Sequence, residues 1–169
     1  TASLKNNVSL YIHISSVGVY GLESEGKINE SNRHLPTNDY EKSKALADKW
    51  LLDQKNIPTI ILRPTTVYGP NMPNDSLKAL FSAIKKRVFF FIGKKSAIAN
   101  YISVGNVVEA IYKVLQNYET KKENLSLCEV FNISDDILFS DFIEFICLVS
   151  GTKLSKIRIP LSIIEFLIK

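Results

Sequence analysis

The sequence has few cysteines and no pattern of metal ligands. Its two cysteines, Cys128 and Cys147, are far apart in 169 residues. Neither has a His or Cys partner at the spacing that a zinc site uses. We therefore expect no metal site and no disulfide framework, and both thiols are predicted to be reduced and buried.

Long apolar runs and stripes of one charge are also missing. No apolar run reaches the roughly 20 residues that span a bilayer, and no secretory signal opens the sequence. The net charge is +4, and the lysines are scattered among acidic residues. These features disfavour nucleic-acid and membrane partners, so we expect a cytoplasmic protein that binds a small molecule.

A glycine-rich dinucleotide fingerprint is absent as well. The seven glycines never fall as G-x-G-x-x-G or G-x-x-G-x-x-G after a strand. Such a fingerprint brings a backbone turn and a helix N-terminus against the pyrophosphate of a dinucleotide. The sequence therefore lacks a pyrophosphate-binding loop of this kind.

What is present is an alternation of apolar strands and amphipathic helices in a chain that is 46% hydrophobic and 22% charged. Strands are expected at 8–14, 58–62, 88–92, 129–133 and 156–159, and helices at 39–56, 76–86, 104–118, 140–150 and 160–169. Strands that alternate with helices favour parallel βαβ construction.

Several residues are expected to delimit or bury these elements. Asn38 and Glu41 have the spacing of a capping box and predict the start of the helix at 39–56. Its buried side is expected to carry Leu46, Ala47, Trp50 and Leu51. The later helix is expected to begin at Ser140 or Asp141 and to close at Gly151. The run Phe89-Phe90-Phe91 is expected to pack in a core or to line a cavity.

The helix at 39–56 carries the first chemical signal. Tyr40 and Lys44 are four residues apart and so share one helix face. A free tyrosine is a poor base at neutral pH, and a fixed ammonium nearby favours its phenolate form. With the Ser16 hydroxyl opposite, these groups could take a proton from an alcohol or give one to a ketone.

A second Tyr-x-x-x-Lys pair, Tyr118 with Lys122, shows that the spacing alone is not specific. Tyr118 precedes a polar segment, and no strand ending in serine is set against it. We therefore interpret Tyr118 as a solvated helix end.

The context of Tyr40 resembles a known family. The chain is similar in five collinear blocks to extended short-chain dehydrogenases/reductases, the NAD-dependent epimerase/dehydratase family. The blocks are YIHISSVGVYG at 11–21, Tyr40-x-x-x-Lys44, LRPTTVYGP at 62–70, YISVGNVVEA at 101–110 and VFNIS at 130–134.

The resemblance implies an α/β fold, part of a Rossmann-like doubly wound parallel sheet plus a small C-terminal α/β substrate-binding lobe. Residues 1–70 would be the C-terminal part of the NAD(P)-binding domain with the catalytic residues. Residues 71–169 would be mainly the substrate-binding lobe, with elements near 100–135 returning to the Rossmann core. Since the family's glycine-rich motif lies upstream, the chain resembles the C-terminal portion of a longer enzyme and is expected to be inactive as an isolated fragment.

The resemblance also implies residue roles. Tyr40 would be the acid/base, Lys44 would hold the nicotinamide ribose, and Ser16 would hydrogen-bond the reacting oxygen. The expected cofactor-binding residues are Ser15, Tyr40, Lys44, Pro64, Thr65 and Val67, and the expected substrate-binding residues are Ser16, Val17 and Thr66. The structural alternative is that the serines cap a strand and that Thr65 and Thr66 complete a turn.

Departures from the family pattern narrow the chemistry. The 4,6-dehydratases carry Asp-Glu after the catalytic residue, whereas this chain has Val17-Gly18, which cannot move a proton. A glutamate that decarboxylases keep in that stretch is missing too. Members that bind UDP-sugars usually have Asn at Thr66 and Arg near Ala99-Asn100, so a bidentate diphosphate clamp is absent there, although Lys94 and Lys95 could substitute.

The resemblance therefore favours an NAD(P)-dependent epimerase or reductase that acts on a nucleotide-activated sugar at C4, with NAD favoured over NADP. One alternative is an NAD(P)H-dependent reductase of a non-nucleotide ketone, sterol-like or flavonoid-like. Another is a non-catalytic Rossmann-like remnant or scaffold. Family members commonly dimerise through two helices, one of which carries the Tyr and Lys, so a homodimer is expected.

Overall fold

The computed structural model describes residues 2–21, 26–54, 56–72, 75–93, 96–120 and 127–168. It forms two compact units, the first from Thr1–Gly69 with Tyr101–Asp135 and the second from Pro70–Asn100 with Asp136–Lys169. The segment near 101–135 thus belongs to the same unit as the start of the chain. The functional roles expected for 1–70 and 71–169 stay predictions.

A three-stranded parallel sheet forms the centre of the first unit. Its order is β1 (Tyr11–Ile14), β2 (Thr59–Pro64) and β7 (Cys128–Ile133). Thr59 lies opposite both Tyr11 and Cys128, which sets the register of the three strands. Every residue of β2 is buried, as expected for the middle strand of a covered parallel sheet.

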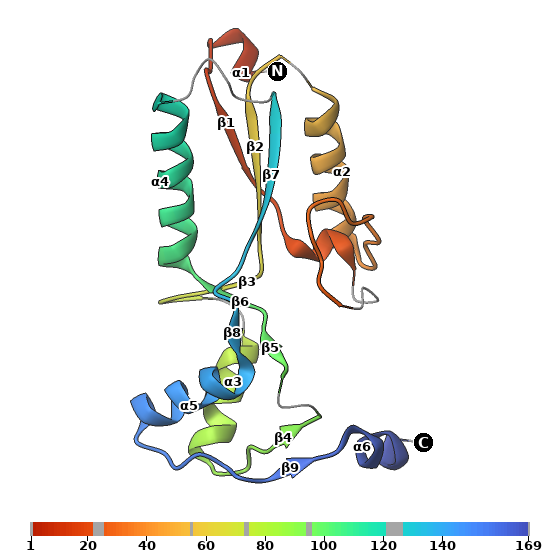
Figure 1. Cartoon of the computed structure of the whole chain (residues 1–169), viewed down its shortest axis with the longest axis vertical. Coiled ribbons are helices and arrows are strands. Elements are labelled where there is room, and N and C mark those ends of the chain that lie inside the picture. The colour runs from red at the N-terminus through yellow and green to blue at the C-terminus, as the bar shows by residue number, and fades with distance from the viewer. Residues whose placement is uncertain are drawn as a thin grey trace. The chain divides into compact units, whose positions relative to one another are not determined.

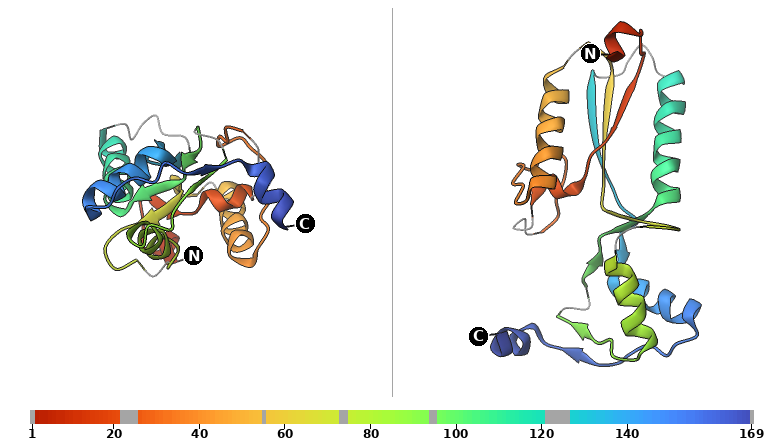
Figure 2. Two further views of the ribbon diagram at one scale, coloured as in Figure 1. Left: turned by 90° about the horizontal axis from the view of Figure 1, so that it is seen from below. Right: turned by 180° about the vertical axis from the view of Figure 1, so that it is seen from behind.

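Helices cover both faces of this sheet. The ribbon shows α2 (Asp39–Asp53) on one face and α4 (Val104–Thr120) on the other, and the view from behind agrees (Figures 1 and 2). Parallel strands between two helical layers form an α/β fold of the Rossmann-like type, as predicted.

The capping box predicted for α2 is present. The Glu41 N–H donates to Asn38 Oδ1 at 2.9 Å, and the Asn38 N–H donates to Glu41 Oε2 at 3.4 Å. The helix ends at Asp53, three residues before the predicted end.

The predicted buried side of α2 was partly wrong. Leu46 is 68% exposed and Trp50 is 50% exposed, whereas Asp48 is fully buried and Leu51 is buried as predicted. The physical reason is a charge partner: Arg63 of β2 is also buried and donates from Nε to Asp48 Oδ2 at 2.8 Å. This ion pair turns a polar side of the helix toward the sheet.

Other elements of the first unit are short. Residues before β1 form α1 (Ala2–Lys5), and β1 starts at Tyr11, later than the predicted start at residue 8. A 3₁₀ helix, η1 (Val17–Tyr20), follows β1 and was not predicted. β3 (Thr66–Tyr68) pairs in parallel with β6 (Tyr101–Ser103), which leads directly into α4.

The second unit has helices α3 (Asp75–Lys85), α5 (Phe139–Ser150) and α6 (Leu161–Ile168). Its strands form two pairs, β4 (Phe91–Ile92) with β9 (Arg158–Ile159) and β5 (Ile98–Ala99) with β8 (Ile137–Leu138). The strands predicted from sequence pair in parallel, as expected, whereas the second pair is antiparallel and neither of its strands was predicted. An antiparallel pair needs no crossover helix, which suits strands this short.

Local predictions in the second unit were mixed. Gly151 closes α5 in the left-handed conformation, as predicted, but the N-cap is Leu138, so the start predicted at Ser140 or Asp141 was wrong. Phe91 is buried, and its ring packs edge-on against Phe89 at 5.0 Å between ring centroids. The aromatic run therefore contributes to a core.

The cysteines are not joined by a disulfide; Cys147 is buried, and Cys128 of β7 is half-buried, less than predicted. Burial raises the pKa of both thiols. Across the described part of the chain, no helix has both the length and the apolar content needed to cross a bilayer.

We predict that Gly21→Ala destabilises the protein strongly. Gly21 closes η1 with φ 75° and ψ 175°, and a Cβ there would lie 2.0 Å from the Leu35 carbonyl oxygen. Strained backbone and a steric clash together should lower the free energy of unfolding by about 2–5 kcal/mol, measured by urea denaturation.

Gly26→Ala is the matched control. Gly26 also has a positive φ of 85°, but a Cβ there would meet nothing within 4 Å. Gly26→Ala should therefore lower the free energy of unfolding by only about 1–2 kcal/mol, the cost of the strained backbone. Equal losses for the two variants would contradict the role given to the Leu35 contact.

Candidate active site

The predicted site residues follow the carboxyl ends of two neighbouring parallel strands. β1 ends at Ile14 and is followed by Ser15 and Ser16, while β2 ends at Pro64 and is followed by Thr65. Open α/β sheets bind their ligands at this edge.

The two serines have different environments. Ser15 is buried, its N–H donates to the Leu62 carbonyl at 2.7 Å, and its buried Oγ has no hydrogen-bond partner in the described residues. Ser16 is the N-cap of η1, where its Oγ accepts from the Gly18 N–H at 3.0 Å. A hydroxyl that accepts in a cap keeps its own proton to donate, so capping and substrate binding are compatible for Ser16.

Lys44 points to the end of β1. Its Nζ donates to the Ile14 carbonyl at 3.0 Å and lies 5.8 Å from the centroid of the Tyr40 ring. Lys44 is half-buried, whereas Tyr40 in the first turn of α2 is 59% exposed. The ammonium is thus held beside the phenol, and the phenol is open to solvent.

Ser16 is brought to the same helix turn through Gly18. A Cβ on Gly18 would lie 3.1 Å from Glu41 Cγ and 3.2 Å from Ser16 Oγ. The side chains of Ser16 and of Glu41, which directly follows Tyr40, therefore both border Gly18. Ser16 thus lies near the first turn of α2, and Lys44 of the same helix reaches the end of the strand that leads into Ser16.

The residues after Arg63 have structural partners of their own. Pro64 is buried, and the Thr65 N–H donates to the Ile133 carbonyl at 3.0 Å. Thr65 Oγ1 is 3.5 Å from Ser134 Oγ, so the contacts of Thr65 are with the end of β7 and not within a turn. Thr66 is exposed and Val67 is half-buried, and both lie in β3, where the backbone pairs with β6.

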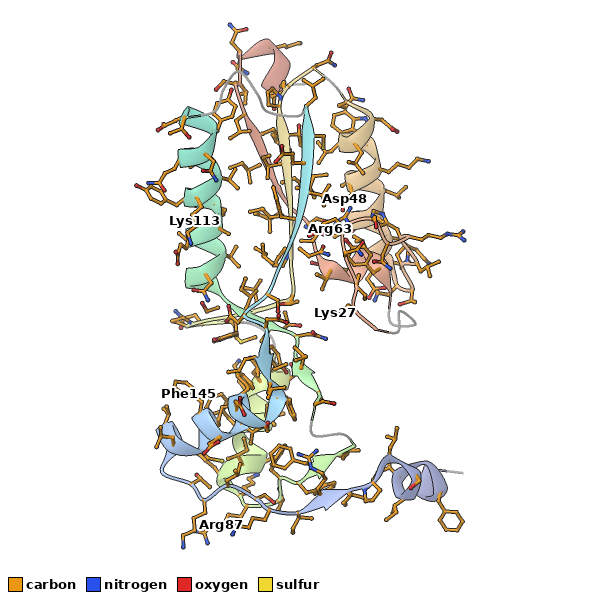
Figure 3. All side chains as sticks on the ribbon, in the orientation of Figure 1. Lys27, Asp48, Arg63, Arg87, Lys113 and Phe145 are labelled. Atoms are coloured by element: carbon orange, nitrogen blue, oxygen red, sulfur yellow. The ribbon has the colours of Figure 1, made fainter. Side chains whose placement is uncertain are left out.

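Sequence reasoning missed a buried polar cluster beneath this site, which we call the anchor network: Tyr20, Asp48, Arg63 and Asn132. Arg63 donates from Nη1 to the Tyr20 hydroxyl at 2.6 Å, in addition to its bond to Asp48. The Tyr20 hydroxyl donates to Asn132 Oδ1 at 2.9 Å. Figure 3 shows Asp48 and Arg63 between α2 and the sheet. An arginine inside an apolar strand was the signal that could have revealed it.

Two histidines border the anchor network. His13 Nε2 lies 3.7 Å from Asp48 Oδ1, and the His34 ring meets the Tyr20 ring edge-on at 5.7 Å. Burial lowers the pKa of both histidines; Lys44 adds to this for His13 and Arg63 adds to it for His34, while Asp48 opposes both shifts. The folded protein therefore favours neutral imidazoles here.

The Glu41 carboxylate caps the start of α2. Its Oε2 accepts from the Thr37 N–H at 2.7 Å and from the Thr37 hydroxyl at 2.8 Å. These hydrogen bonds, with that from the Asn38 N–H, lower the pKa of Glu41. Its charge thus stabilises the helix turn that carries Tyr40.

The second Tyr-x-x-x-Lys pair lies elsewhere in the first unit. Tyr118 is half-buried near the end of α4, and its hydroxyl donates to the Ser9 carbonyl, which precedes β1. This position is at the amino end of the strand, away from Ser16. Lys122 lies outside the described residues, as do Lys94 and Lys95.

The fold and this site define an α/β protein of the Rossmann-like class with polar side chains gathered at the carboxyl ends of its strands. A sequence model of the NAD-dependent epimerase/dehydratase family matches residues 1–134. The chain belongs to this family.

Curated relatives and solved structures agree with the family. The chain is 25% identical to short-chain dehydrogenase/reductase family 42E member 1 of Xenopus laevis, over 98% of this chain and 47% of that protein. It is 30% identical to human dTDP-D-glucose 4,6-dehydratase, over 69% of this chain and 35% of that protein. The UDP-glucuronic acid 4-epimerase of Bacillus cereus in complex with NAD matches with a TM-score of 0.65 and 26% identity, over 94% of this chain and 52% of that one.

The chain thus spans about half the length of these proteins, or less.

We predict that stability falls as the pH drops from 7.5 to 5.5. In the unfolded state a histidine has its ordinary pKa of about 6.5. In the folded state burial lowers the pKa of His13 and His34. The unfolded state then binds more protons, so stability present above pH 6.5 is lost as the pH falls. Urea unfolding across this range measures the slope.

The control is a variant with both histidines replaced by glutamine. The chain has two histidines, the side chains whose ordinary pKa lies within this range. The double variant should show a flatter pH dependence than the parent protein. An unchanged slope would show that the histidines are not its source.

Proposed function

We propose that the protein is an NAD(P)-dependent epimerase or reductase that acts at C4 of a nucleotide-activated sugar, with Ser16, Tyr40 and Lys44 as its catalytic residues. The observation that carries the proposal is the position of Lys44. Its ammonium is fixed between the Ile14 carbonyl and the Tyr40 ring at the end of the strand that leads into Ser16. Family membership and a 4-epimerase among the similar structures support it.

The residues at the strand ends suit a nicotinamide cofactor. Ser15 presents a buried hydroxyl that has no described partner, and Lys44 presents an ammonium that can donate to ribose hydroxyls. We propose that these two residues, with Tyr40, Pro64, Thr65 and Val67, hold the cofactor, and that NAD is preferred. The cofactor, when bound, supplies the oxidation and reduction at the sugar carbon.

The protein's own part in the reaction is to move and hold a proton. The Tyr40 phenolic oxygen takes the proton of the reacting hydroxyl when the alcohol is oxidised and returns it when the ketone is reduced. Ser16 donates its hydroxyl proton to the same substrate oxygen and fixes its position. Lys44, held by the Ile14 carbonyl, places a positive charge beside the Tyr40 ring.

The residues after Ser16 favour epimerisation or simple reduction over dehydration. Loss of water needs a further acid and base beside the sugar, and Val17 and Gly18 offer neither. Position 18 is also tight for a side chain, because a Cβ there would lie 3.1 Å from Glu41 Cγ and 3.2 Å from Ser16 Oγ. Dehydratases belong to the same family as this chain, but the acid and base that dehydration needs are missing at positions 17 and 18.

A reductase of a non-nucleotide ketone is the competing proposal. Sugar-nucleotide enzymes of the resembled family carry an arginine near residues 99–100, whereas this chain has Ala99, which is buried in β5, and Asn100. The missing arginine favours a substrate without a diphosphate. Thr66, where such members have Asn, is exposed and would contact substrate in either case. A non-catalytic scaffold is the third possibility, and loss of Tyr40 would leave its properties unchanged.

We also propose a homodimer and a cytoplasmic location. The outer side of α2 exposes Leu46 and Trp50, apolar side chains that a second copy could cover. A cytoplasmic location is supported by the reduced thiol of Cys147, since reducing compartments keep thiols from forming disulfides.

We predict that Tyr40→Phe in the native protein lowers turnover by about 10²–10⁴-fold, because the proton acceptor is removed. The affinity for NADH, measured by fluorescence titration, should change little, because the other proposed cofactor-binding residues remain. Tyr118→Phe is the matched control, since it removes a hydroxyl at the other end of the sheet. Full turnover by Tyr40→Phe would reject the assignment.

We predict that UDP-sugars or dTDP-sugars raise the melting temperature of the native protein in the presence of NAD. A ligand that binds the folded state stabilises it by mass action, by about 2.7 kcal/mol at one hundred times its Kd. Steroid and flavonoid ketones serve as the comparison set. Stabilisation by these ketones alone would favour the competing reductase.

A further inference from the structure

The ion pair inside the anchor network is unusual in its burial. Arg63 is 1% exposed and Asp48 is 0% exposed, and the bond between them is 2.8 Å long. Taking two charges out of water is costly, and apolar residues of similar size often give equal or greater stability. Such a pair contributes a fixed geometry, because its donors and acceptors must meet at defined atoms.

Tyr20 extends this geometry to two further elements. Its hydroxyl accepts from Arg63 and donates to Asn132, and Arg63 Cζ lies 5.1 Å from the centroid of its ring. Tyr20 is fully buried at the end of η1, and Asn132 lies in β7. The network therefore ties together η1, α2, β2 and β7.

Members of the network are close in sequence to the catalytic residues proposed above. Tyr20 follows Ser16 by four residues: Ser16 is the N-cap of η1, and Tyr20 is its last residue. Asp48 follows Lys44 by four residues on the same face of α2. A shift of either network residue is therefore transmitted through a rigid helical turn to a catalytic side chain.

The end of β2 is held in the same way. Arg63 immediately precedes Pro64, the last residue of the strand and the start of the proposed cofactor segment. One hydrogen-bonded network thus reaches all three segments of the proposed site.

We propose that Tyr20, Asp48, Arg63 and Asn132 are positioning residues that hold Ser16 and the Tyr40–Lys44 turn in their reactive arrangement. None of them needs to contact substrate. For catalysis the inference rests on the proposed function, while the positioning itself is a property of the folded chain and can be measured without turnover.

The test is Tyr20→Phe, which keeps the ring and removes the hydroxyl that links Arg63 to Asn132. Hydrogen exchange of the amides at 39–44 in the native protein should become about tenfold faster, because Arg63, which holds Asp48 of α2, loses its second hydrogen-bond partner. Turnover should fall about 10–100-fold with KM nearly unchanged, since small displacements of catalytic groups impair the chemical step. Tyr118→Phe should match the parent protein in both measurements.

A second pair of variants keeps the test valid if Tyr20→Phe does not fold. Asn132 is half-buried, and Asn132→Asp retains an oxygen that accepts from Tyr20, whereas Asn132→Val removes it. Asn132→Asp should keep slow exchange at 39–44 and most of the turnover, and Asn132→Val should lose both.

The outcomes separate this inference from the proposed function. The positioning role would be overturned if Tyr20→Phe and Asn132→Val showed the same hydrogen exchange and the same turnover as Tyr118→Phe. Faster exchange with unchanged turnover would overturn it as well. Full activity of Tyr40→Phe would instead refute the proposed function, and the exchange comparison would still decide whether the network holds the helix turn.

Discussion

The buried charge pair between Asp48 and Arg63 is the interaction on which the proposed site depends most. An apolar helix face can slide or rotate on a sheet at small cost, whereas a buried ion pair is satisfied only when its atoms meet. It therefore fixes both the rotation and the height of α2 against β2. Lys44 and Tyr40 lie about one and two turns earlier on the same face, so their direction follows from this pair.

Much of the first unit could be predicted from sequence because its signals are local. The capping box of Asn38 and Glu41 marks the start of α2 within four residues. Apolar runs identify β2 and β7, and parallel strands bring their carboxyl ends to one edge. For this reason the serines after β1 and the residues after β2 could be placed near one another before any coordinates.

The rest depends on contacts between distant residues, which a single sequence does not reveal. Leu46 and Trp50 had the apolar character of a core face, but Asp48 occupies it because of Arg63, 15 residues further along. Tyr20 and Asn132 are 112 residues apart and meet only in the fold. In the second unit the apolar runs at 88–92 and 156–159 indicated β4 and β9, whereas β5 and β8 were missed because two residues are too few for a hydrophobic period.

The proposed acid/base residue Tyr40 lies in the first turn of a helix, a position that is accessible but mechanically weak because helix ends fray. Tyr40 is 59% exposed there, which a substrate requires, and the fraying is countered from two sides. The Glu41 carboxylate accepts hydrogen bonds from the Thr37 and Asn38 N–H groups at the helix start. Asp48, bonded to Arg63, anchors the following turns to the sheet. The exposed phenol is thereby carried by a helix whose start is capped and whose middle is buried, and access to substrate does not require a flexible site.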